Sequence, residues 1–285
     1  MHIRNPVEWG LDFVRSAGSA VDAVTHVGVY RKAEALPSIR RIELSDLGDA
    51  LAKGLGDFAA YRTDVIFLCA IYPIVGLILA RLAFGYDMLP LLFPLASGFA
   101  LIGPFAAVGL YEISRQRERG ESVTWSDAFA VFHSHSLGAI VVLGLVLMGV
   151  FLMWLSAAMA IYSLTLGPEP PASIASFARA VFTTDAGWAL IFLGVGIGFL
   201  FAVLVLTISV VSFPLLLDRN VGLRTAVATS VRTVIVNPGP MAIWGLIVAG
   251  GLVVGSIPLF FGLIIVMPVL GHATWHLYRS VVDPR

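Results

Sequence analysis

The sequence contains little cysteine and little charge. Its 285 residues include a single cysteine, Cys69, so neither an intrachain disulfide nor a metal site built from paired cysteines is available. Charged residues make up 13% of the chain and hydrophobic residues 58%, with a mean hydropathy of +0.91. Average proteins carry about 25% charged residues. The composition excludes a soluble globular fold and indicates an integral membrane protein whose principal partner is the lipid bilayer.

An excess of positive charge is also absent. The 18 Lys and Arg residues are balanced by 18 Asp and Glu residues, whereas a nucleic-acid-binding protein needs an excess of positive charge to neutralise phosphates. No nucleic-acid partner is therefore expected.

Familiar catalytic motifs are absent as well. The sequence holds no Walker-type phosphate loop, no Gly-x-Ser-x-Gly elbow and no His-Glu-x-x-His helix. The glycine-rich run 194–198 lies inside an apolar segment with no strand before it. We interpret this run, with Gly251 and Gly255, as a surface that lets helices pack closely. We therefore expect the protein not to be an enzyme.

Uncharged intervals predict six membrane-spanning helices. One crossing needs about 20 largely apolar residues. The final uncharged interval, 233–271, is long enough for two crossings, and Gly255-Ser256-Ile257-Pro258 near its middle predicts a tight hairpin. The predicted fold class is therefore an all-α, polytopic helical membrane protein with six transmembrane helices in three hairpins. The predicted spans are 65–84, 88–111, 137–163, 187–217, 239–256 and 258–278.

The distribution of positive charge predicts the orientation. Sixteen of the 18 Lys and Arg residues fall on one side of this topology, and only Arg81 and Arg179 fall on the other. Because Lys and Arg concentrate on the cytoplasmic side, we expect both termini of this multi-pass protein in the cytoplasm. Residues 1–36 are expected to form a flexible cytoplasmic tail, followed by the six-span membrane domain, 37–285.

The spans show signs of an internal repeat. A short amphipathic segment precedes spans one, three and five, as expected of interfacial helices. The second span of each pair carries a proline near its cytoplasmic end, where a kink is tolerated. These matches favour a threefold repeat of an interfacial helix and a hairpin, with chance similarity between apolar segments as the alternative. The prolines are Pro104, Pro214 and Pro268.

Histidines near the predicted cytoplasmic side suggest a metal or haem site. His272 and His276 are four residues apart, so they share one face of the last span, beside Trp275. Neutral imidazole is a common metal ligand. His133 and His135 lie on the same predicted side, so a four-histidine metal site is one hypothesis, although residues two apart on a helix point to different faces. The alternative is an interfacial belt of aromatic and basic residues.

Acidic and basic residues also meet where spans end on this side. Glu112 is followed by Arg115, and Asp218 by Arg219. One interpretation is a polar cytoplasmic-side site made by these four residues, and the other is local ion pairing at helix ends. No ionisable residue lies at the centre of any predicted span. Because ion-coupled carriers usually place an ionisable residue there, a transporter is less favoured. A transport site made of unwound backbone near the prolines is the alternative.

Four separated segments resemble one known family. They are PSIRRI at 37–42, the stretch 103–115 that ends in GLYEISR, SFPLLLDR at 212–219 and GHATWHLYR at 271–279. Together they are similar to a bacterial, mainly proteobacterial, family of predicted integral membrane proteins of unknown function. The resemblance implies a bacterial inner-membrane location but no reaction and no cofactor. Some family members are linked to cytochrome c oxidase, but this chain lacks the spaced transmembrane histidines of a haem-copper subunit.

The sequence is compatible with three functions. The first is a non-enzymatic structural, assembly or accessory component, within a membrane-protein complex. The second is a carrier or permease for a small solute. The third is a metal- or haem-binding accessory component of a respiratory complex that uses His272 and His276.

Overall fold

The protein is described here by a computed structural model over residues 36–60, 73–78, 81, 89–121 and 124–283. Most of the predicted 1–36 tail and most of the first predicted span, 65–84, lie outside these residues, as does Cys69.

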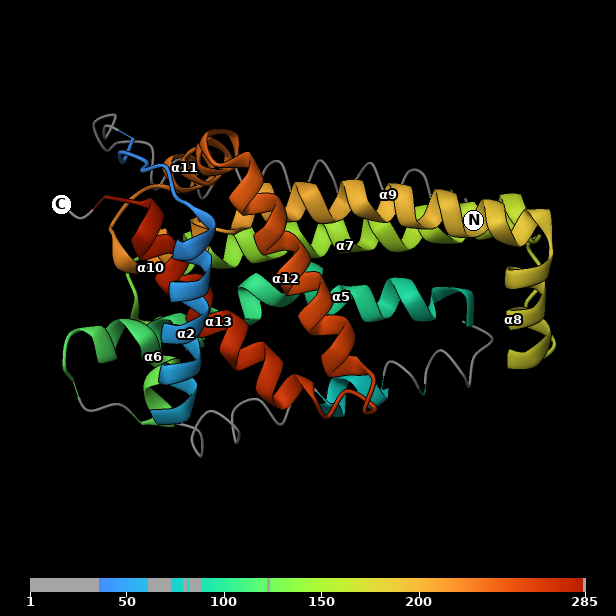
Figure 1. The fold of residues 1–285 in the computed structure, drawn as a ribbon, viewed down its shortest axis with the longest axis horizontal. Helices are drawn as coiled ribbons and strands as arrows, with labels where there is room; N and C mark the ends of the chain where they lie inside the picture. Colours follow the sequence, from blue (N-terminus) through green and yellow to red (C-terminus); the bar gives the residue numbers. More distant parts are fainter. Residues whose placement is uncertain (1–35, 61–72, 79–80, 82–88, 122–123, 284–285) are drawn as a thin grey trace, which may run out of the picture.

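The named elements of the described part are all helices, as the sequence predicts (Figure 1). In chain order they are α2 (Leu44–Ala60), η1 (Leu89–Leu91), α5 (Leu92–Ala106), α6 (Val108–Glu118), η2 (Trp125–His133), α7 (Leu137–Thr165), α8 (Ile174–Thr183), α9 (Asp185–Ser209), α10 (Ser212–Asp218), α11 (Leu223–Val236), α12 (Pro238–Ser256) and α13 (Leu263–Val281).

Four helical segments of the described chain are long and apolar enough to cross a membrane. They match the second to fifth predicted spans. Helix α13, which holds most of the sixth predicted span, is not among them, because its second half carries His272, His276 and Arg279. An integral membrane protein with several apolar helices is therefore established, and a total of six spans stays a prediction. The four segments are Leu92–Glu118, Leu137–Thr165, Asp185–Asp218 and Pro238–Ser256.

The three repeat prolines act differently. The helix containing Pro104 breaks at Ala107, between α5 and α6, and the break between α9 and α10 comes just before Pro214. The break before Pro214 lies where that proline removes a backbone donor, whereas α5 continues through Pro104 for two residues before its break. Helix α13 instead runs on through Pro268 without interruption. The predicted threefold repeat stays a prediction.

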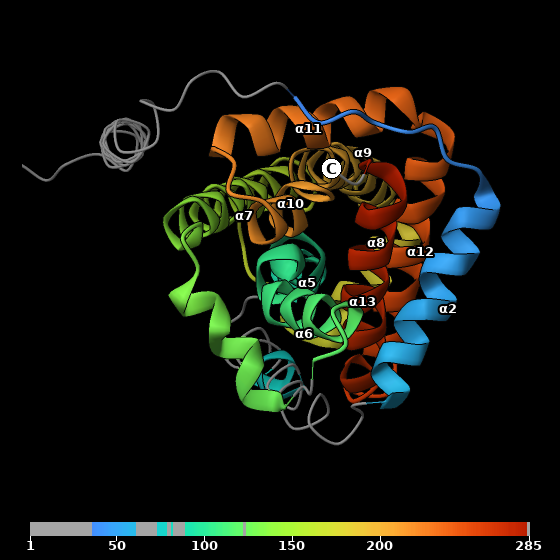
Figure 2. The ribbon, with the colours of Figure 1, turned by 90° about the vertical axis from the view of Figure 1, so that its left-hand side faces the viewer.

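The helices divide the molecule into an apolar arm and a polar end (Figure 1). Helices α7 and α9 lie side by side along the long axis, and α8 lies at their far end. Helices α2, α6 and α10 gather at the other end with the second half of α13. Figure 2 shows α2 lying against α13, the most extensive helix pair of the described fold.

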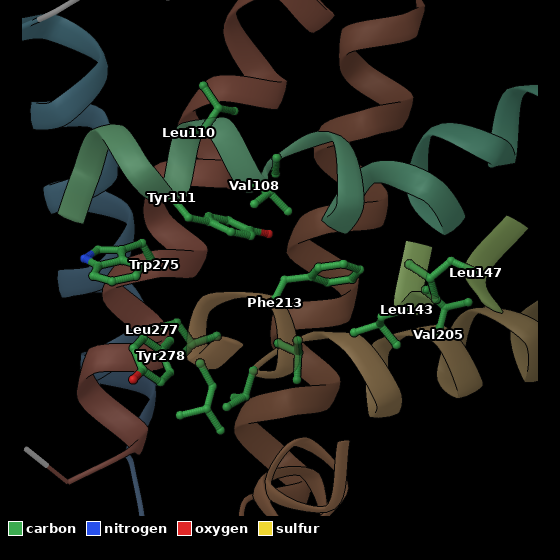
Figure 3. Close-up of a cluster of buried hydrophobic side chains, with 14 of the residues drawn as sticks. Val108, Leu110, Tyr111, Leu143, Leu147, Val205, Phe213, Trp275, Leu277 and Tyr278 are labelled. Carbon is green, nitrogen blue, oxygen red and sulfur yellow. The ribbon is translucent and has the colours of Figure 1, made fainter. Parts of the chain in front are cut away.

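A cluster of large buried side chains lies toward the polar end (Figure 3). Phe213 of α10 and Trp275 of α13 are completely buried there, among leucines and valines of α6, α7 and α9. Along the arm the pattern reverses, since Phe192 and Phe199 of α9 are 70% and 63% exposed. Such an apolar exterior is typical of a surface that faces lipid or a partner helix.

The chain ends of the fold are tied together at the polar end. Ile39, ahead of α2, forms an isolated antiparallel bridge with Val282, after α13. Asn237, between α11 and α12, accepts a hydrogen bond from the Ile42 amide at 2.9 Å and donates one to the Arg40 carbonyl at 3.1 Å. The segment leading into α2 is therefore fixed at two places.

The leucines at positions 44, 47, 51 and 55, spaced by three and four residues, predict one apolar face on the segment that forms α2. Leu47, Ala50, Gly54 and Asp57 are the buried positions. Two of the leucines expected on the apolar face, Leu44 and Leu55, are each 55% exposed.

The glycines predicted to mediate helix packing fall into two groups. Gly251 and Gly255 of α12 lie against side chains of α13, and Gly198 of α9 lies against the Trp154 ring. The other two glycines of the 194–198 run face open space. Among the glycines of the 194–198 run, therefore, only Gly198 packs against another helix of the described chain.

One glycine sets the distance between α2 and α13. A Cβ atom on Gly54 would lie 2.5 Å from the backbone nitrogen of Ala273. Backbone cannot move aside as a side chain can, so the approach requires glycine.

We predict that Gly54→Ala destabilises the docking of α2 by about 1–3 kcal/mol through overpacking. Gly56→Ala is the matched control on the same helix, because its Cβ atom would meet nothing within 4 Å. We expect this control to raise stability slightly, because alanine favours helix. Thermal unfolding of both variants in detergent measures the difference. Equal effects would show that the α2–α13 contact does not require glycine.

Candidate polar site at one end of the helix bundle

A buried carboxylate on α2 lies at the centre of the polar end. Asp57 is 5% exposed. Its Oδ2 accepts hydrogen bonds from Ser114 Oγ of α6 at 2.6 Å and from His276 Nε2 of α13 at 2.9 Å. Its Oδ1 accepts one from Arg117 of α6 at 2.6 Å. A single side chain thus joins three helices.

The surroundings of Asp57 keep it ionised at neutral pH. Burial raises the pKa of a carboxyl group, but hydrogen bonds from His276 and Ser114 and the charges of nearby histidines outweigh it. The net effect is a pKa for Asp57 below the usual 3.8. Hydrogen bonds to the charged form lower a carboxyl pKa in this way.

The hydroxyl of Ser114 extends the network to a second histidine. Ser114 Oγ lies 2.8 Å from Nδ1 of His272, which is fully buried. A hydroxyl has one hydrogen, and Ser114 donates it to Asp57. His272 must then donate from Nδ1 to the serine oxygen.

This arrangement does not form a nucleophilic triad. In such a triad the histidine lies between the serine and the acid, so that it can accept the serine proton. Here Ser114 lies between Asp57 and His272. Ser114 is also only 1% exposed, so a substrate has no access to its hydroxyl.

The histidines predicted to hold a metal occupy separate places. His272 and His276 each use one ring nitrogen in the Asp57 network. His135 lines a different cavity, and the side chain of His133 lies outside what the structure describes. Among the described residues, no group of three or more His, Cys, Asp and Glu side chains is placed to hold a metal ion. The fit to a metal is therefore poor, and the four-histidine site stays a prediction.

The four residues of the predicted cytoplasmic-side site surround one cavity. Glu112, Arg115, Asp218 and Arg219 all line a pocket of about 300 Å³ between α6 and α10. We call it the α6–α10 pocket. His135 lines it too, although the sequence interpretation assigned that residue to the metal site.

Buried Glu112 forms an ion pair with half-buried Arg115 in this pocket. Arg115 donates to Glu112 Oε1 at 2.8 Å and to the Leu217 carbonyl at 2.6 Å. Gln116 donates to the same Glu112 oxygen at 2.9 Å. The other carboxylate oxygen, Glu112 Oε2, is buried and has no hydrogen-bond partner among the described residues.

Asp218 and Arg219 connect the pocket to α13 and its C-terminal extension. Tyr278 donates its hydroxyl hydrogen to Asp218 Oδ2 at 2.6 Å, and Arg279 lies 3.6 Å from the same oxygen. Arg219 lies 3.8 Å from Asp218 and donates to the Asp283 carbonyl at 2.5 Å. Both predicted interpretations of these charges therefore have support, because local ion pairs and a shared pocket coexist.

Asp57, Ser114 and Arg117 were not anticipated from the sequence. A signal for Asp57 is present, because it follows Leu47, Ala50 and Gly54 at spacings of three and four residues. A carboxylate on the buried face of an amphipathic helix must find partners in the fold.

The fold and the polar end define a helical integral membrane protein. Residues 92–218 match the family described as "Predicted integral membrane protein (DUF2189)", which confirms the resemblance to a family of predicted integral membrane proteins of unknown function. The match runs from α5 to α10 and includes Glu112, Ser114 and Asp218, whereas Asp57 and His276 lie outside it. Comparisons with curated proteins and with solved structures gave no match.

We predict that Asp57→Asn lowers the free energy of unfolding at pH 7 by about 2 kcal/mol, because it removes a charged hydrogen-bond acceptor from a buried site. The pKa of Asp57 is depressed, so this contribution is present above pH 3.8 and is lost as the pH falls through the native-state pKa. Unfolding in detergent as a function of pH measures it.

Asp49→Asn is the control for this prediction, because Asp49 lies on the same helix and is exposed. The stabilities of the wild-type protein and the Asp57 variant should approach each other as the pH falls below 3.8 and should be equal below the native-state pKa of Asp57. A constant difference at all pH values would show that the carboxylate charge is not the cause.

Proposed function

We propose that the protein is a non-enzymatic component of a membrane assembly, with a structural, assembly or accessory role. The observation that supports this proposal is that the buried polar groups form hydrogen bonds with each other. Asp57, Ser114 and the two histidines of α13 hold α2, α6 and α13 together. A general base must reach its substrate within hydrogen-bonding distance, and Asp57, Ser114 and His272 are buried inside the protein.

The exposed apolar arm supports the same role. Only 6% of the most apolar window of the Asp185–Asp218 segment is buried inside the chain. That surface has room for lipid and for helices of a partner protein, and its aromatic residues favour close contact.

A carrier for an apolar or amphipathic solute is the second candidate. A cavity of about 400 Å³ lies between α5, α9, α12 and α13. It is lined almost wholly by apolar side chains, with Tyr111, Ser209 and Thr274 as its polar members. A carrier of charged solutes requires polar groups at this depth, so the cavity favours a lipid-like solute.

We also propose that the protein spans a bacterial inner membrane six times, with both termini in the cytoplasm. The positions of Arg115, Arg117 and Arg279 support this orientation, because all three lie at the polar end. Helix α8, at the far end of the arm, would then face the opposite side.

Cysteine labelling tests the orientation. In a Cys69→Ala background, we expect a membrane-impermeant maleimide to label Ala172→Cys in intact cells, because residue 172 is exposed just before α8. Glu121→Cys, exposed after α6, should be labelled only after the membrane is permeabilised. The reverse pattern would contradict the proposed topology.

Purification in mild detergent tests the assembly role. We expect the chain to co-purify with a membrane-protein partner at a fixed stoichiometry, and native mass spectrometry gives that stoichiometry. A chain that purifies alone and moves a lipid-like solute between proteoliposome leaflets would contradict the assembly role and favour the carrier.

Metal analysis and an absorption spectrum of the same preparation address the histidine hypothesis. We expect neither stoichiometric metal nor a haem band, and we expect His272→Ala and His276→Ala to change stability alone. A bound metal that is lost in both variants would overturn this expectation.

A further inference from the structure

The α6–α10 pocket has the features of a ligand site. Its walls come from α6, from η2 and the residues that follow it, from α10 and from the turn after α10. Chain segments far apart in sequence therefore converge on one volume of about 300 Å³, within the range of small-molecule sites.

The pocket lies where two apolar segments end. Glu112 lies within the last seven residues of the Leu92–Glu118 segment. Asp218 is the last residue of the Asp185–Asp218 segment. The ends of membrane-spanning segments lie at the level of lipid headgroups. The pocket therefore lies at the depth of the lipid headgroups.

The charges around the pocket are balanced. Two carboxylates, Glu112 and Asp218, face two guanidinium groups, Arg115 and Arg219. A ligand with one net charge gains no net attraction from such a set. A compact zwitterion is attracted at both of its ends, because its positive end meets a carboxylate and its negative end meets a guanidinium group.

One acceptor in the pocket lacks a donor. Glu112 is 2% exposed, and its Oε2 atom has no hydrogen-bond partner among the described residues. A buried carboxylate oxygen without a donor is costly. A primary ammonium group carries three N–H donors, whereas a quaternary ammonium carries none. The unpaired oxygen therefore favours a ligand with a primary ammonium.

We propose that the α6–α10 pocket binds a zwitterion made of a primary ammonium and a phosphate, as found in the ethanolamine headgroup of a phospholipid. The ammonium donates to Glu112, and the phosphate accepts from Arg219 and from exposed His135. Arginine suits phosphate because its planar donors match the phosphate oxygens. This site is independent of the assembly role proposed above, and either can fail without the other.

Native mass spectrometry of the full-length protein in detergent tests the proposal. Phosphatidylethanolamine, phosphatidylcholine and phosphatidylglycerol with identical acyl chains are compared as ligands. We expect the ethanolamine lipid to bind about tenfold more tightly than the other two. Tightest binding of the anionic lipid would overturn the proposal, and equal binding of all three would show that a phospholipid is not the source of the zwitterion.

Soluble phosphoethanolamine separates the lipid from a free zwitterion. Displacement of bound ethanolamine lipid by soluble phosphoethanolamine supports recognition of the headgroup in this pocket. Binding of phosphoethanolamine without any preference among the lipids would support the same chemistry with a free ligand. Absence of both effects would overturn the site.

Glu112→Gln removes the proposed partner of the ammonium while keeping the side-chain shape. We expect binding of the ethanolamine lipid to weaken about tenfold or more. Glu118→Gln is the matched control, because Glu118 lies on the same helix, pairs with Arg279 and does not line this pocket. Equal loss in both variants would contradict the assignment.

A second pair of variants tests the same site if Glu112→Gln, at a buried position, does not fold. Ala130 lines the pocket and is half-buried, so Ala130→Phe fills the volume without replacing a charged residue. We expect it to abolish the lipid preference, whereas Ala130→Ser keeps it. Unchanged binding by a folded Ala130→Phe protein would show that the lipid binds elsewhere.

Discussion

The ionised carboxylate of Asp57 is the constraint on which the polar end of the molecule depends. A charge removed from water must be surrounded by donors, and here those donors come from Ser114 and Arg117 of α6 and His276 of α13. Their positions fix α2 against both helices. The close approach at Gly54, one turn earlier on α2, adds a steric requirement to the electrostatic one. Neighbouring contacts, such as Trp275 with Glu118, reinforce the same interface.

Different interactions determine the structure of the two ends of the molecule. At the polar end, charged and hydrogen-bonding groups neutralise one another between packed helices. Along the arm, the aromatic and aliphatic side chains of α9 remain outside the core, where the bilayer is the solvent. The family that residues 92–218 match is described as a predicted integral membrane protein of unknown function. The arrangement of this chain, with a rigid polar end and an apolar exterior, accords with a role in assembly.

Composition and charge spacing predicted the helical class and the second to fifth spans, because long apolar runs have few alternatives to a transmembrane helix. The sequence also identified Glu112, Arg115, Asp218 and Arg219, which the fold places around one pocket. It did not reveal the role of Asp57, because its partners lie up to 219 residues away in sequence. Nor did it distinguish the uninterrupted helix at Pro268 from the breaks near Pro104 and Pro214. Those outcomes depend on tertiary packing rather than on local pattern.

The pairing of α2 with α13 has a consequence for biosynthesis. The ribosome makes α2 before any other described helix, and α13 is the last. The contact between Asp57 and His276, and the bridge between Ile39 and Val282, therefore cannot form until α13 has been translated. Until then α2 carries a carboxylate and a glycine-lined face without their partner. Docking of α2 thus follows the synthesis of α13, and a truncated product lacking α13 leaves the α13-facing side of α2 uncovered.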